Sequence, residues 1–153
     1  MKNYTTIVFI GFLLLAITTQ ADALQTVGVP IKVGFSVTQV KNAYFTDLKP
    51  VVSDVPDKTV MDLRGLGVKV FFFNTSGKVD TIRLDAPFRG SVQGIKIGDS
   101  LPTLQKKLGK PSKIIGTATR VEGGYIYLPK DKKGFVRFDL DDSNEVETIF
   151  LGD

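Results

Sequence analysis

The chain of 153 residues contains no cysteine and no histidine. Without a thiol it can form neither a disulfide nor a thiolate nucleophile. Without an imidazole it has no Ser-His pair, and it lacks the commonest general base and the commonest transition-metal ligand. We therefore expect no enzyme activity, no cofactor and no metal site. Packing and hydrogen bonds alone must stabilise the fold.

The sequence also lacks an apolar run long enough to span a membrane. Its longest apolar run, Ile7–Ile17, is shorter than the roughly 20 residues of a membrane helix. Lys2 precedes this run, and the small-x-small sequence Ala21-Asp22-Ala23 follows it. This order predicts a signal peptide over residues 1–23, cleaved before Leu24. No cysteine near this point could carry a lipid, so we expect a released protein in the periplasm or outside the cell.

The excess of positive charge is small, at a formal +4. It is too small to indicate a nucleic-acid-binding protein. It weakly favours an anionic partner, which could be an acidic protein, a phospholipid surface or a cell-wall polymer.

Two stretches of the remaining chain are similar to each other. Ile31–Val37 reads IKVGFSV, and Ile95–Leu101 reads IKIGDSL. A helical apolar pattern follows each stretch, and Ser36 and Ser100 stand where a side-chain oxygen caps the first free N–H groups. The similarity predicts two repeats, residues 24–89 and residues 90–153.

Strand patterns follow each predicted helix. Val68–Leu84 aligns with Phe135–Leu151, and each contains two strands around a polar turn. An earlier strand over Thr59–Leu63 corresponds to Tyr125–Pro129. The expected fold class is α+β: a tandem duplication of a helix–three-strand unit, with one antiparallel sheet and the helices on one face.

The string Gly34-Phe35-Ser36-Val37-Thr38-Gln39-Val40 resembles the G-M-[ST]-x-x-[QE]-V signature of β-lactamase-inhibitor-protein-like domains. The same signature occurs in outer-membrane-assembly lipoproteins of the SmpA/OmlA type. Leu108-Gly109-Lys110-Pro111 is similar to the L-G-x-P ending of their helices. The resemblance implies a tandem of these domains and a binding role. The chain lacks the disulfides of the inhibitors and the lipid-bearing cysteine of the lipoproteins, so neither family's partner carries over.

Comparing the two expected repeats predicts which strand residues face the helices. Aligned positions that are apolar in both repeats should face inward, because side chains alternate between the faces of a strand. The inward set is Phe71, Phe73, Ile82, Leu84 and Val60, with their partners Phe138, Leu140, Ile149, Leu151 and Ile126.

The outward set is rich in the residue types that are enriched at protein interfaces. It comprises Met61, Val70, Phe72, Arg83, Tyr125, Tyr127, Arg137 and Phe150. We expect these residues to contact a partner. Two alternatives stay open: a part of the same chain covers this face, or a second copy does.

These expectations favour a non-catalytic exported protein-binding module, such as an inhibitor, immunity or adaptor protein of the cell envelope. The alternative is a structural envelope factor that contacts lipid or cell wall. A basic loop containing Lys130, Lys132 and Lys133 offers an anionic surface contact for the alternative. No nucleic acid and no transmembrane helix are expected for the mature chain.

Overall fold

The computed structural model describes residues 25–116, 124–129 and 133–153, so the predicted signal peptide lies outside the described residues. The expected fold class is wrong: the described part of the chain is mostly β, and its α-helices are two short segments, α1 (Val37–Tyr44) and α2 (Leu101–Leu108). Each helix has eight residues and is followed by four strands of the main sheet, not three. None of the described helices is long and apolar enough to cross a membrane.

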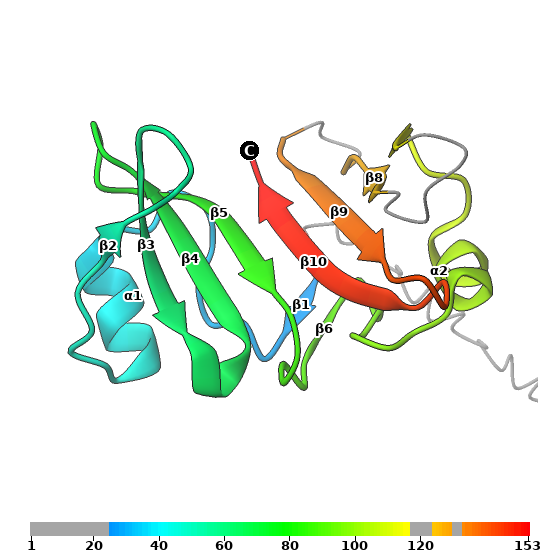
Figure 1. The fold of residues 1–153 in the computed structure, drawn as a ribbon, viewed down its shortest axis with the longest axis horizontal. Helices are drawn as coiled ribbons and strands as arrows, with labels where there is room; N and C mark the ends of the chain where they lie inside the picture. Colours follow the sequence, from blue (N-terminus) through cyan, green and yellow to red (C-terminus); the bar gives the residue numbers. More distant parts are fainter. Residues whose placement is uncertain (1–24, 117–123, 130–132) are drawn as a thin grey trace, which may run out of the picture.

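Eight strands form one antiparallel sheet in the order β2-β3-β4-β5-β10-β9-β8-β7. Their bounds are β2 Val51–Val52, β3 Lys58–Leu63, β4 Val68–Phe73, β5 Val79–Leu84, β7 Lys113–Ile115, β8 Gly124–Tyr127, β9 Phe135–Leu140 and β10 Val146–Gly152. The two halves of the chain meet where β10 pairs with β5, at the centre of the sheet (Figure 1). A short 3-10 helix, Arg64–Leu66, joins β3 to β4.

The two strands of this sheet that were not predicted, β2 and β7, lie at its two edges. They are two and three residues long, too short for an alternating pattern to be recognised. The helices are short because each ends early. Phe45 turns the chain out of α1 in a left-handed conformation (φ 49°), and Gly109 caps α2 with φ 74°.

The turn before each helix docks onto the central strands in the same way. Gly34 donates a 2.8 Å hydrogen bond to the carbonyl of Val79, and Gly98 donates an equal one to Val146. Both glycines have φ near +85°, which favours glycine. The predicted cap at Ser36 is confirmed: its hydroxyl accepts from Gln39 N–H at 3.3 Å. Ser100 is also at the N-cap, but its hydroxyl contacts Thr103 instead.

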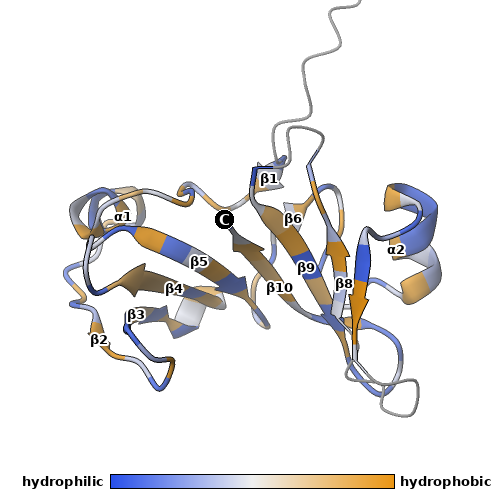
Figure 2. Ribbon diagram, turned by 90° about the horizontal axis from the view of Figure 1, so that it is seen from above, coloured by the Kyte–Doolittle hydropathy of each residue, from blue (hydrophilic) through white to orange (hydrophobic). Residues whose placement is uncertain are grey.

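Both helices lie on the same face of the sheet as a second, two-stranded sheet, formed by β1 (Thr26–Val27) and β6 (Ser91–Val92) (Figure 2). This layer covers the hydrophobic core. The central residues of the helices, Val40 and Leu104, are fully buried there against the strands. The largest fully buried strand side chains are Phe72, Phe138, Met61, Ile82, Leu84 and Ile149.

The face of strand β4 that is buried in the core is the opposite of the one predicted. Phe72 and Val70 are fully buried, whereas Phe71 is half-buried and Phe73 is 43% exposed. Strand β9 follows the prediction, because Phe138 and Leu140 are buried. The cause is the turn. The last hydrogen-bonded pair before the turn is Phe73–Lys78 in the first hairpin and Asp141–Glu145 in the second. Four residues lie between the members of the first pair, but only three lie between those of the second. Side chains alternate with a period of two, so a one-residue difference reverses the face of every residue in β4.

The orientation predicted for β3 and β8 is also wrong. Met61 is buried and pairs across the strands with Val70, in a row that continues through Ile82, Leu151 and Val136 to Tyr127 on the helix side. The ring of Tyr127 meets that of Phe138 edge-on at 5.9 Å, and its hydroxyl donates to the carbonyl of Gly109 at the end of α2. Tyr125 pairs with Phe138 and faces the same way, so Val60 and Ile126 face outward. These strands are too short for their apolar residues alone to indicate the buried face.

Candidate functional site

The face of the sheet opposite the helices is not covered by any of the described helices or strands (Figure 2). We call it the open face. Of the eight residues predicted to contact a partner, Arg83, Phe150 and Arg137 lie together on it. The other five face the helix side: Met61, Val70, Phe72, Tyr125 and Tyr127.

The strand register aligns seven open-face residues in a single line across the sheet. Each is the direct cross-strand partner of the next, in the order Asp62, Lys69, Arg83, Phe150, Arg137, Ile126 and Lys113. We call this line the central row. Paired strands lie about 4.8 Å apart, so the row is roughly 29 Å long. It contains four cations, one carboxylate and two apolar side chains.

The centre of this row is an aromatic ring between two guanidinium groups. The Cζ atom of Arg137 lies 4.6 Å from the centroid of the Phe150 ring, and that of Arg83 lies 5.9 Å from it. Both distances are within the range of a cation–π interaction. The ring is therefore held between the two arginines on neighbouring strands.

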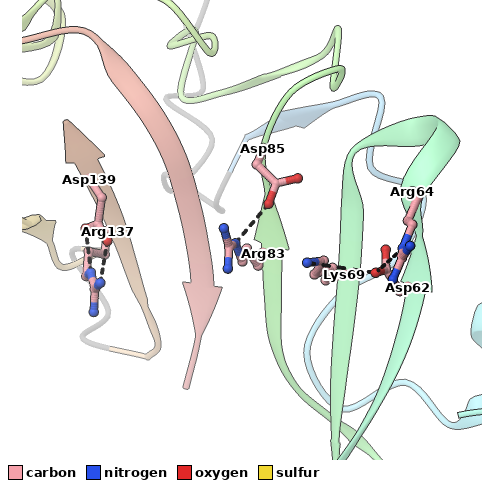
Figure 3. Close-up of polar contacts among 7 residues, drawn as sticks. All are labelled: Asp62, Arg64, Lys69, Arg83, Asp85, Arg137 and Asp139. Atoms are coloured by element: carbon pink, nitrogen blue, oxygen red, sulfur yellow. Dashed lines mark hydrogen bonds and ion pairs between the residues drawn. The ribbon is translucent and has the colours of Figure 1, made fainter. Parts of the chain in front are cut away.

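Each of these arginines is paired with an aspartate two residues later in the chain, which is Asp139 in β9 and Asp85 directly after the end of β5. Nε of Arg137 donates to Oδ1 of Asp139 at 2.6 Å, and its Nη2 donates to Oδ2. Nε of Arg83 lies 2.9 Å from Oδ2 of Asp85, an ion pair without the geometry of a hydrogen bond. Figure 3 shows the two pairs on either side of β10. The hydrogen bonds to Asp139 raise the pKa of Arg137, although desolvation opposes them.

Gly124 makes room for the Arg137–Asp139 pair. A Cβ atom on Gly124 would lie 2.8 Å from Oδ1 of Asp139 and 2.9 Å from Nε of Arg137. The Arg137–Asp139 pair therefore lies flat over the backbone of β8. This close approach is a reason for a glycine at a strand position.

Two different rows flank the central row. On one side the cross-strand partners are Val60, Phe71, Thr81, Gly152 and Phe135, without a charge. On the other side, Thr148, Asp139, Gly124 and Ile115 form a line. The open face thus carries a cationic line between an uncharged border and a border that contains a carboxylate.

The surface is hollowed beside the central row. A hollow of about 400 Å³ is lined by Arg83, Arg137 and Phe150 together with Glu147, Thr148 and Asp139. A neighbouring hollow of about 550 Å³ shares Arg83, Glu147 and Thr148, and adds the carboxylates of Asp85, Asp141 and Glu145. The first hollow is therefore lined by two guanidinium groups and two carboxylates, whereas the second hollow has an excess of carboxylates.

A separate cleft of about 180 Å³ lies beside Ile31, Lys32, Phe135 and Leu151. It is smaller than the hollows of the open face and contains neither Arg83 nor Arg137. We favour the open face because the arginines and Phe150 converge there. Of the predicted basic loop, Lys130 and Lys132 lie outside the described residues, and Lys133 is exposed beside this cleft. The described residues contain no group of three or more acidic side chains that could hold a metal ion.

Most of the central row was not predicted from the sequence, and the sequence pattern indicated only Arg83, Phe150 and Arg137 as outward residues of this row. It did not single out Lys69, Lys113 or Asp62, and it placed Ile126 inside. One signal was available: Arg83-Leu84-Asp85 and Arg137-Phe138-Asp139 share the spacing Arg-x-Asp. On a strand this spacing puts both charges on the same face, which marks the strand positions of the ion pairs.

Comparison with known proteins shows a likeness in fold alone. No protein-family model matches the chain, and no curated protein matches it. The crystal structure of a DUF4309 family protein, YjgB from Bacillus subtilis, is similar with a TM-score of 0.50 and 16% sequence identity. The similarity covers 76% of this chain and 77% of that one. None of these comparisons tests the resemblance to the β-lactamase-inhibitor-protein-like or SmpA/OmlA-type domains, which stays a prediction.

Proposed function

We propose that the chain is an exported, non-catalytic protein-binding module, an inhibitor, immunity or adaptor protein of the cell envelope, and that it holds its partner on the open face. One observation carries this proposal: Arg83, Phe150 and Arg137 stand side by side at the centre of an uncovered sheet face. Arginine and aromatic side chains dominate binding energy at protein interfaces, especially near their centre.

The dimensions of the face favour a macromolecular partner. The central row spans seven strands, and a standard protein interface buries about 800 Å² on each side. The ion pairs hold the two guanidinium groups in place before binding, which lowers the entropy lost on association. A sheet face of this kind binds a broad surface better than it encloses a small molecule.

The test compares two substitutions of phenylalanine by alanine. Phe150→Ala removes the ring between the arginines. Phe45→Ala is the matched control, because Phe45 is 97% exposed at the end of α1, outside the rows of the open face. Proteins captured from an envelope fraction by the wild-type chain would be compared with those captured by each variant, and the affinity of each candidate would then be measured.

A specific partner should bind the Phe45→Ala variant normally and the Phe150→Ala variant at least ~30-fold more weakly, which corresponds to the ~2 kcal/mol at which the hot-spot range begins. The proposal is wrong if every captured protein binds both variants with wild-type affinity. Circular dichroism of both variants checks that they are folded.

The second candidate function is a structural envelope factor that contacts lipid or cell wall. One observation favours it: α2 and the residues around it expose Lys96, Lys106, Lys107 and Lys110. This basic surface belongs to the helix layer and not to the open face. Sedimentation with vesicles that contain an anionic phospholipid would test it, with Lys106→Gln expected to weaken binding and Phe150→Ala expected to leave it unchanged.

A further inference from the structure

Three of the four cations in the central row are regularly spaced, and the fourth, Lys69, stands next to Arg83 and lies 3.8 Å from Oδ2 of Asp62. Arg83 and Arg137 are separated by two strand-to-strand steps, with Phe150 between them, and Arg137 and Lys113 are separated by two more, with Ile126 between them. At about 4.8 Å for each step, both separations are about 9.6 Å. Three cations thus recur at equal strand-to-strand intervals along the row, with an apolar side chain in each gap.

We propose that the central row binds an extended acidic segment of the partner protein in which every third residue is a carboxylate. This inference rests on the proposed protein-binding function and names the chemistry of the partner. A polyproline II segment has three residues per turn and rises about 3.1 Å per residue, so residues i, i+3 and i+6 point the same way at about 9.3 Å intervals. This repeat matches the spacing of Arg83, Arg137 and Lys113.

A ligand in the β conformation fits the row less well. Its side chains return to the same face every second residue, at about 6.7 Å. Its carboxylates would therefore fall out of step with the cations after the first contact. The spacing thus selects the polyproline II conformation.

The arginines have unused donors for such a ligand. Asp85 contacts only Nε of Arg83, so both Nη groups of this guanidinium are available. Asp139 takes Nε and Nη2 of Arg137 and leaves Nη1. Lys113 is exposed and has no ion pair among the described residues. Arginine forms directional, charge-assisted hydrogen bonds with carboxylates, which gives each contact both strength and orientation.

Phe150 and Ile126 provide the apolar contacts between the carboxylates. Proline-rich segments bind to grooves lined by aromatic side chains, because their backbone is already extended and loses little entropy. The Phe150 ring, held between two cations, is a surface for a proline that stands between two acidic residues.

The borders of the row restrict where the segment can lie. On one side, Glu147, Asp141 and Glu145 line the neighbouring hollow and would repel an acidic chain. On the other side, Val60, Phe71 and Thr81 offer no positive charge. Repulsion on one side and the lack of attraction on the other keep the carboxylates on the central row, which is a source of specificity.

The experiment measures the binding of two peptides to the full chain. One peptide repeats Glu-Pro-Pro, and the other has the same composition with all its glutamates adjacent. Both have the same composition and the same net charge, so net charge alone cannot cause a difference between them. We expect the repeat to bind at least ~10-fold more tightly than its isomer, because a charge-assisted hydrogen bond formed in register is worth about a factor of ten or more.

Substitutions locate the binding on the row. Arg83→Gln and Arg137→Gln should each weaken binding of the repeat by ~10-fold, and the more exposed Lys113→Gln by ~3-fold. Lys106→Gln is the matched control, because it removes one positive charge from the exposed side of α2 and should change nothing. Arg137→Gln could unfold because Asp139 loses its partner. In that case the test uses Arg137→Lys, Arg83→Gln and Lys113→Gln instead.

Equal binding of the two peptides would overturn the inference, as would an equal loss in Lys106→Gln, because either result means that net charge alone attracts the ligand. Binding to anionic vesicles that is lost in Arg83→Gln would also overturn it, since it would identify a lipid headgroup as the ligand. A failure of this inference can be distinguished from a failure of the proposed function. If a captured partner depends on Phe150 but the Glu-Pro-Pro peptide does not bind, the binding module stands and only the acidic segment is wrong.

Discussion

The hairpins β4–β5 and β9–β10 occupy corresponding places in the two halves of the chain, and their second strands are read correctly from the sequence. Ile82, Leu84, Ile149 and Leu151 are all buried as predicted. Their first strands differ, because the turn of the first hairpin is one residue longer. Phe71 and Phe138 align by sequence, yet Phe138 is in the core and Phe71 is on the open face. A similarity between sequences therefore transfers a side chain's environment only when the turn between the strands has the same length.

The largest expected effect tests this comparison directly. Phe72→Ala and Phe138→Ala should each lower the free energy of unfolding by ~3–5 kcal/mol, because both side chains are fully buried. Phe71→Ala should cost ~1 kcal/mol, because Phe71 is half-buried on the open face. Denaturant midpoints of the three variants measure these changes. A larger loss for Phe71→Ala than for Phe72→Ala would restore the alignment-based assignment.

The two helices provide a second comparison, with Tyr44 in α1 where α2 has Leu108. The Tyr44 hydroxyl is buried and has no hydrogen-bond partner among the described residues, and burial raises its pKa to about 12. The folded state thus holds this proton more tightly than the unfolded state, whose tyrosine pKa is about 10. The contribution of this raised pKa to the free energy of unfolding is fully present below pH ~10 and is lost as the pH rises towards ~12.

We expect this loss to reach ~1–2 kcal/mol, after a reduction for solvent screening of a partly exposed group. Tyr44→Phe should raise stability by up to ~1 kcal/mol at neutral pH, because it removes an unsatisfied hydroxyl. It should also reduce the decline above pH ~10. Some loss of stability at alkaline pH should remain in this variant, because burial also raises the pKa of Tyr127. Unfolding curves at several alkaline pH values check both effects, and an unchanged pH profile would contradict them.

The smallest expected effect concerns the turns themselves. The residue two positions before the second strand is left-handed in both hairpins: Gly77 has φ 61° and Asn144 has φ 60°. Asparagine tolerates this conformation less well than glycine. Asn144→Gly should therefore stabilise by ~0.5 kcal/mol, and Gly77→Asn should destabilise by a similar amount. A Cβ on Gly77 meets no atom within 4 Å, so the difference reports backbone conformation alone. Thermal unfolding would detect it, and opposite signs are the required result.

The sequence indicated the antiparallel hairpins, the glycine turns into the helices and the cap at Ser36, because these features depend on a few neighbouring residues. It also indicated Arg83, Arg137 and Phe150 as a candidate contact set. It did not indicate the mostly β class, because β2 and β7 form only when an adjacent strand supplies their hydrogen-bond partners.

The central row was decided by the tertiary structure alone. Its seven residues come from seven strands, and no local pattern states which residue of one strand lies opposite which residue of another. That register follows from the turn lengths and from the burial of one face, which are properties of the whole sheet. The composition of the chain determined which side chains were available for binding. The pairing of β5 with β10 determined that Arg83, Phe150 and Arg137 stand together, because within the eight-stranded sheet this pairing is the one that joins the two halves.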